Sequence, residues 1–97
     1  MRYFGILQYK GTNYCGWQKQ TISKLPSIQD EVETVLSKIL NSKIKIYGSG
    51  RTDAGVHALG QTFHFDSDKE IDSYKFVHSF NQLIPNDIVL LDIKKVD

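Results

Sequence analysis

The sequence predicts an α+β fold whose elements run strand, helix, strand, strand, helix, strand. Two observations support this order. Three segments alternate with the period of two expected of half-buried strands and a fourth is β-branched and apolar, while two longer segments carry apolar residues three and four positions apart, as amphipathic helices do. With 97 residues, 40% of them apolar, and a formal net charge of +1, the chain has the composition of a single folded domain and not of a disordered tail.

The first strand is predicted from Arg2 to Lys10, where alternate residues point to opposite faces. The next residue is Gly11, which begins a break in the alternation. One face of this strand carries Tyr3, Leu7 and Tyr9, and the other carries Phe4 and Ile6.

The first helix is predicted to begin after Ser27, because a serine followed three positions later by an acid, here Asp30, resembles a capping box. Asn41 is expected to end it. A strand with one wet face and one dry face is predicted next, from Lys43 to Tyr47. The apolar stripe of the helix consists of Ile28, Val32, Val35, Leu36 and Ile39.

A third strand is predicted from Gln61 to Phe65, with both phenylalanines on one face. A second helix is expected to be capped by Asp72 or Ser73 and stopped by Pro85, which cannot continue a helix. The last strand is predicted from Ile88 to Val96. The apolar stripe of the second helix consists of Phe76, Val77, Phe80, Leu83 and Ile84.

This order of elements is that of the ferredoxin-like fold. We therefore expect a four-stranded antiparallel sheet with both helices packed on one face. The opposite face of the sheet would then be open to a ligand.

Charge is distributed unevenly along the chain. Residues 1–52 carry eight basic and three acidic residues, whereas residues 53–97 carry four basic and eight acidic ones. The segment from Tyr9 to Lys24 combines three lysines with aromatic residues and contains no acid, a mixture suited to phosphates and bases together. A lysine-bearing surface loop with a partly buried Trp17 accounts for the same composition.

Several classes of site are excluded by composition. The single cysteine, Cys15, cannot form an internal disulfide or a zinc site with several thiolates, and the three histidines lack the HExxH spacing. We therefore expect no metal. The chain has no apolar stretch long enough to span a membrane, so a soluble cytoplasmic protein is predicted.

The segment from Gly48 to Gly60 holds four of the seven glycines. Glycines allow the backbone to approach a ligand closely, so such a loop can present its charged side chains, here Arg51 and Asp53, to a large substrate. The alternative is a simple connector in which these two residues pair or cap. The segment matches neither the dinucleotide-binding fingerprint nor the phosphate-binding P-loop.

Three short motifs follow one another along the chain: GWQKQ from Gly16 to Gln20, the residues Ser27 to Gln29, and GRTDAGVHA from Gly50 to Ala58. Together they resemble motifs of the tRNA pseudouridine synthase A family. The segment from Gly50 to Ala58, which reads GRTDAGVHA, resembles the signature of that family. The segment from Gly16 to Gln20, which reads GWQKQ, resembles its second N-terminal signature, and the residues from Ser27 to Gln29 resemble the start of its first helix. The resemblance implies that residues 1–97 form the N-terminal half that carries the catalytic aspartate.

By this resemblance, the protein isomerises uridine to pseudouridine in the anticodon stem-loop of tRNA without a cofactor. Asp53 would be the nucleophile, and Arg51 would help to flip the base or orient Asp53. Attack at C1′, attack at C6 and a glycosyl-cation route all remain open. The resemblance also implies a homodimer built from longer chains with a second, related domain. The residues expected to bind RNA are Lys10, Trp17, Gln18, Lys19, Lys24, Thr52 and His57.

One alternative function also fits the predicted fold. A ferredoxin-like sheet can bind RNA through aromatic side chains on its strands without catalysis, and Phe63 and Phe65 would be the candidates. An inactive fragment of the enzyme is the other alternative. The glycine-rich loop would have no role in a binding module.

Overall fold

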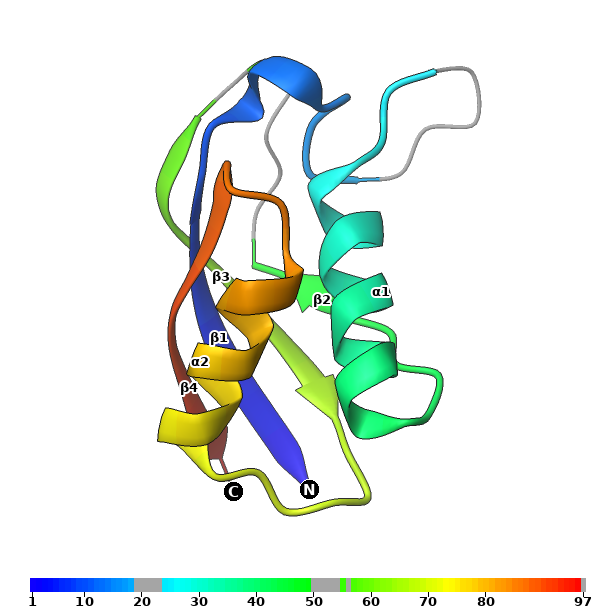
Figure 1. The fold of residues 1–97 in the computed structure, drawn as a ribbon, viewed down its shortest axis with the longest axis vertical. Coiled ribbons are helices and arrows are strands. Elements are labelled where there is room, and N and C mark those ends of the chain that lie inside the picture. The colour runs from blue at the N-terminus through cyan, green and yellow to red at the C-terminus, as the bar shows by residue number, and fades with distance from the viewer. Residues whose placement is uncertain (19–23, 50–54, 56, 97) are drawn as a thin grey trace.

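The computed structural model describes residues 1–18, 24–49, 55 and 57–96 and has the predicted order of elements (Figure 1). The four strands form one antiparallel sheet in the order β2-β3-β1-β4, which confirms the ferredoxin-like arrangement. The elements are β1 (Arg2–Tyr9), a 3₁₀ turn η1 (Gly11–Asn13), α1 (Ile28–Leu40), β2 (Tyr47–Gly48), β3 (Ala58–Asp66), α2 (Ser73–Leu83) and β4 (Ile88–Val96).

Both helices begin and end where local chemistry predicts. The Ser27 hydroxyl accepts a hydrogen bond from the Asp30 amide at 3.0 Å, and Asp72 caps α2 in the same way. At its other end α1 stops at Asn41, which lies in the left-handed region with φ of 52°. The helix α2 ends just before Pro85.

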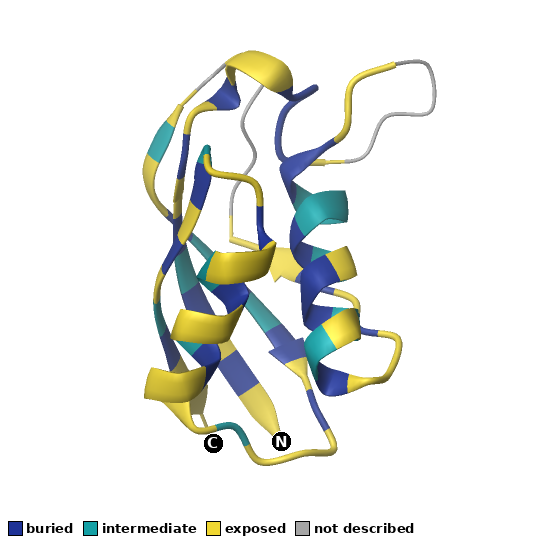
Figure 2. Ribbon diagram, in the orientation of Figure 1, coloured by how far each residue is buried: buried dark blue, intermediate teal, exposed yellow. Residues whose placement is uncertain are grey.

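One face of the sheet and the inner faces of both helices share a single hydrophobic core (Figure 2). Phe63 and Phe65 on β3 are fully buried, and their rings stack with a centroid distance of 6.0 Å. Tyr3 on β1 continues the stack at 5.8 Å from Phe65. The apolar positions predicted to form the core are confirmed with one clear exception, because Leu83 at the end of α2 is 49% exposed.

The predicted strand from Lys43 to Tyr47 is wrong in its extent, because only Tyr47 and Gly48 pair with β3. The backbone amides just before Tyr47 are instead bound by side chains of α1. The Ile44 amide donates to the Ser37 hydroxyl at 3.0 Å, and the Ile46 amide donates to the Glu33 carboxylate at 3.0 Å. These amides therefore need no partner strand, although Ile44 and Ile46 are buried as the alternation predicted.

The third strand is longer than predicted. It begins at Ala58, which pairs with Tyr9 after an irregularity in the register of β1 and β3. The loop therefore does not extend to Gly60 as the glycine count suggested, because β1 remains extended up to Tyr9 and offers a partner to those residues.

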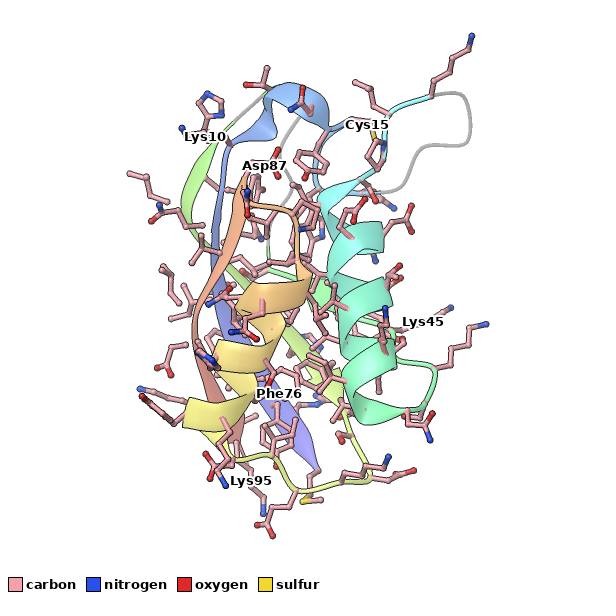
Figure 3. The ribbon with its side chains drawn as sticks, in the orientation of Figure 1. Lys10, Cys15, Lys45, Phe76, Asp87 and Lys95 are labelled. Carbon is pink, nitrogen blue, oxygen red and sulfur yellow. The ribbon has the colours of Figure 1, made fainter. Side chains whose placement is uncertain are left out.

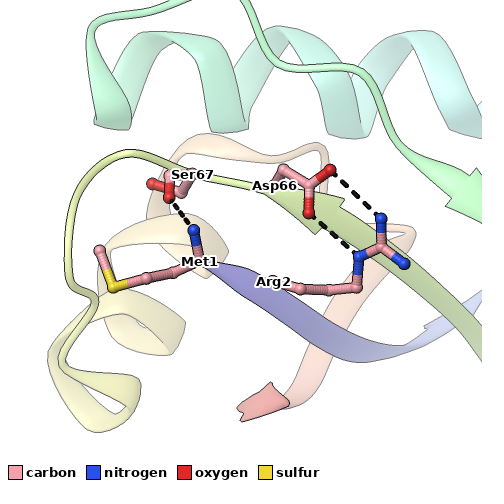
Figure 4. Close-up of polar contacts among 4 residues, drawn as sticks. All are labelled: Met1, Arg2, Asp66 and Ser67. Atoms are coloured by element: carbon pink, nitrogen blue, oxygen red, sulfur yellow. Dashed lines mark hydrogen bonds and ion pairs between the residues drawn. The ribbon is translucent and has the colours of Figure 1, made fainter. Parts of the chain in front are cut away.

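Polar contacts join the start of β1 to the end of β3 (Figure 4). Arg2 forms a hydrogen-bonded ion pair with Asp66 at 3.0 Å, and this contact holds the pKa of Asp66 below its usual value. The terminal ammonium group of Met1 donates to the Ser67 carbonyl at 2.9 Å. Ala58, in the second half of the glycine-rich segment, lies at the opposite end of these two strands, where it pairs with Tyr9.

Candidate active site

The structure describes the two flanks of the glycine-rich segment. Gly48 and Ser49 are its first two residues, and Gly55 and His57 lie in its second half. Four of the predicted site residues fall outside the described residues, and they are Lys19, Arg51, Thr52 and Asp53.

The first flank is held by β3 and by Trp17. The Ser49 amide donates to the Thr62 carbonyl at 3.1 Å, and the hydroxyl groups of the two residues are hydrogen-bonded. Gly48 lies against the Trp17 indole so closely that a Cβ atom placed on it would be 2.6 Å from the ring. Only glycine fits there without displacing the tryptophan. The close contact with Trp17 therefore explains why position 48 is a glycine.

The second flank is held by the turn that follows β1. The Gly55 amide donates to the Tyr14 carbonyl at 3.3 Å. Two residues later along the chain, His57 Nδ1 accepts a hydrogen bond of 2.8 Å from the Gly11 amide. Residues 11–14 therefore bind the loop at two points after Asp53.

The turn that follows β1 is also bound to Asp87, which lies just before β4. The Lys10 amide donates to the Asp87 carbonyl at 2.9 Å, and the Tyr14 hydroxyl donates to the Asp87 carboxylate at 2.5 Å. Figure 3 shows Lys10 and Asp87 at the same end of the domain. Burial raises the pKa of Tyr14, and the hydrogen bond to Asp87 raises it further.

Replacing Tyr14 with phenylalanine should reduce the free energy of unfolding near neutral pH by about 1.5–3 kcal/mol, because it removes a buried hydrogen bond to a charged group. The cost should shrink above about pH 10, where an unfolded tyrosine ionises. Folded Tyr14 stays protonated in this pH range, so ionisation stabilises only the unfolded state of the wild type. The wild type therefore loses the stability that the tyrosine hydroxyl contributes, whereas the phenylalanine variant has no such group to ionise. Urea unfolding at neutral and alkaline pH measures this, and a difference that stays constant with pH would contradict it.

The segment after the turn also builds the start of α1. The first amides of a helix lack partners within it. Here the Ile28 amide donates to the Gly16 carbonyl at 3.1 Å, and the Gln29 amide donates to the Trp17 carbonyl at 3.0 Å. One short segment, Gly16 to Gln18, therefore caps α1 and supports the glycine-rich loop.

Two hollows open beside the flanks of the loop. One, of about 320 Å³, is lined in part by Trp17, Gln18, Gly48 and Ser49. The other, of about 470 Å³, is lined in part by Lys10, His57, Leu59 and Asp87. Both lie next to the ends of the segment that contains Asp53.

The comparison with known proteins now identifies the family. The family model described as tRNA pseudouridine synthase matches residues 6–97. The chain belongs to the tRNA pseudouridine synthase family. Two of its three resembling segments are joined directly, because the carbonyl groups of Gly16 and Trp17 accept hydrogen bonds from the amides of Ile28 and Gln29.

Curated relatives of this family are similar over nearly the whole chain. The chain is 45% identical to a tRNA pseudouridine synthase A of Maridesulfovibrio salexigens over 94% of its own length and 33% of that protein. It is 48% identical to the enzyme of the same name from Neorickettsia sennetsu over 100% of its own length and 40% of that protein. The chain thus spans about a third of the length of the relatives it matches.

The predicted RNA-binding residues that the structure describes differ in their exposure to solvent. Lys10, Gln18, Lys24 and His57 are exposed. Trp17 is only 3% exposed and belongs to the core, so the structure shows its packing role, and base stacking on it stays a prediction. Of the two phenylalanines considered for a non-catalytic RNA platform, both are fully buried on the helix side of the sheet.

Residues 1–18, 24–49, 55 and 57–96 contain no group of three histidine, cysteine or acidic side chains placed to hold a metal ion. Among these same residues, no helix is long and apolar enough to cross a membrane. Cys15 is buried.

Sequence reasoning did not find three of the residues that support the site. The glycine-rich motif drew attention to the loop, but nothing in the sequence linked it to Gly11, Tyr14 or Asp87. The available signal was a glycine directly after the first strand, which marks a turn without showing what the turn contacts.

Proposed function

We propose that this chain is the catalytic-aspartate half of a tRNA pseudouridine synthase, and that the whole protein isomerises uridine in the anticodon stem-loop of tRNA. The family match over residues 6–97 carries the proposal. Two contacts near the signature segments support it. Trp17, in the second signature segment, lies against Gly48, just before the first, and Tyr14, just before the second, binds Gly55 within the first.

In the proposed reaction, the bond between N1 of uracil and C1′ of the ribose breaks, the base turns, and C5 bonds to C1′. C5 loses a proton and N1 gains one, so the product is an isomer of the substrate. Asp53 is the nucleophile. An aspartate with an ordinary pKa of about 3.9 is anionic at neutral pH and needs no base to activate it.

The uridine must leave its stack before a carboxylate can reach the sugar, at a cost of a few kcal/mol. Arg51, two positions before Asp53, takes the role of filling the vacated space or orienting the carboxylate. The exposed side chains of Lys10 and Lys24 contact phosphates, together with Lys19. Gln18 and Thr52 complete the proposed RNA contacts, whereas His57, expected from the sequence to bind RNA, is bound to the Gly11 amide.

The whole enzyme, in this proposal, acts in the cytoplasm without a cofactor, as a homodimer of longer chains. The alternative is a protein that binds RNA through a ferredoxin-like sheet without catalysis. Phe63 and Phe65 are buried, so these two side chains cannot stack on bases in that alternative.

The test uses the longest form of the protein encoded by the same gene and tRNA transcripts labelled with tritium at C5 of uridine. We expect release of tritium to water and an equal yield of pseudouridine after nuclease digestion. Transcripts that lack uridine in the anticodon stem-loop should release none. Binding of tRNA without any release would favour the non-catalytic alternative, and release from other regions would refute the proposed target.

A further inference from the structure

We infer that His57 is a positioning residue, which acts by accepting the Gly11 amide hydrogen bond at its Nδ1 atom and so holds the segment that follows Asp53 against the turn after β1. The inference rests on the proposed function. It assigns a specific atom of His57 a role other than the contact with RNA predicted from the sequence.

The contact is directional and joins distant parts of the chain. The Gly11 amide lies 2.8 Å from His57 Nδ1, and the two residues are 46 positions apart. Gly11 is buried, and a buried amide without a partner is destabilising. A backbone amide can only donate, so Nδ1 carries no proton and the neutral ring holds its proton at Nε2.

The turn that donates this bond is held from its other side. Its neighbour Lys10 binds the Asp87 carbonyl at 2.9 Å through its amide, and Tyr14 binds the Asp87 carboxylate at 2.5 Å. The turn is therefore fixed to the start of β4 and presents a rigid donor to His57. A catalytic group must be held within a fraction of an ångström of its productive position, and residues bound in this way provide such support.

A second contact acts in parallel. The Gly55 amide donates to the Tyr14 carbonyl at 3.3 Å. Gly55 and His57 follow Asp53 by two and four positions. Both of these contacts are made by the same turn, and of the two only the contact at His57 depends on a side chain of the loop.

The experiment compares three substitutions in the longest form of the protein. The Oδ1 atom of asparagine occupies nearly the place of Nδ1, whereas Oε1 of glutamine corresponds to Nε2. We expect His57→Asn to keep the single-turnover rate of pseudouridine formation within about threefold of wild type, and His57→Gln and His57→Ala to lose about tenfold or more. The dissociation constant for tRNA should stay within about twofold in all three.

His78→Ala is the matched control. His78 lies on the exposed side of α2, where it is hydrogen-bonded to Gln82, and its loss should leave both quantities unchanged. Thermal unfolding of each variant verifies that it folds. A glutamine variant that keeps the rate while the asparagine variant loses it would overturn the inference, as would weaker tRNA binding at an unchanged rate in the variants.

A measurement on the 97-residue wild-type chain tests the contact without any variant and without activity. Nitrogen chemical shifts of the His57 ring at neutral pH should show an unprotonated Nδ1 and a protonated Nε2, with a hydrogen-bond coupling from the Gly11 amide. The opposite tautomer would overturn the inference. If the wild-type enzyme forms no pseudouridine at all, the proposed function fails, and this spectrum still decides the contact.

Discussion

Replacement of Trp17 by alanine is expected to lower the free energy of unfolding by about 3–5 kcal/mol, the usual cost of removing a large buried aromatic side chain. Trp17 is 3% exposed and belongs to the central core cluster. Its indole covers Gly48, so the variant would open a cavity between the start of α1 and the loop. Urea unfolding followed by far-ultraviolet circular dichroism measures the loss, and Trp17→Phe should lose clearly less.

The contact between Trp17 and Gly48 can be isolated with a second substitution. Gly48→Ala places a methyl group about where the indole lies, 2.6 Å from its nearest atoms, and should cost about 1–3 kcal/mol in the wild type. In the Trp17→Ala background the same methyl group has space, so its cost should largely disappear. Strictly additive effects of the two substitutions would contradict the packing described here.

The parts of the fold that depend on neighbouring residues in the chain were predictable from the sequence. Ser27 and Asp72 cap their helices through bonds to amides three positions later, and the sequence places both partners together. The alternation that buries Phe63 and Phe65 is equally local. These features required no knowledge of distant contacts.

The errors arose where distant side chains bind the backbone. The alternation from Lys43 to Tyr47 predicted which side chains are buried, but not that Glu33 and Ser37 would take the amides a partner strand would otherwise bind. The same holds for Asn81 on α2, whose side-chain amide bonds both backbone groups of Leu90. Nothing in the sequence pattern marks these partners.

In the candidate active site, too, features that are local in the sequence were predictable and contacts between distant residues were not. The glycine-rich motif and its two charged residues were evident in the sequence. The support by Trp17, Tyr14 and Gly11 was not, because each contact joins residues that are more than thirty positions apart. His57 was predicted as an RNA contact from its place in the motif, whereas the structure shows its Nδ1 bound to the backbone of the turn.

Replacement of Asp53 by asparagine is expected to reduce pseudouridine formation by about a thousandfold or more, because a neutral amide of the same shape cannot act as the nucleophile. The dissociation constant for tRNA should change only by a small factor, since one side chain contributes little to an interface dominated by phosphate contacts. Asp66→Asn is the matched control. Asp66 lies at the far end of β3 in an exposed ion pair with Arg2, which contributes little to stability.

The decisive measurement is the single-turnover release of tritium from tRNA labelled at C5 of uridine, with the longest form of the protein in excess. Wild type and Asp66→Asn should release tritium at the same rate, and Asp53→Asn should release it at about a thousandth of that rate or less while it still binds the tRNA. Release by Asp53→Asn at the wild-type rate would contradict the assignment of this loop as the catalytic centre.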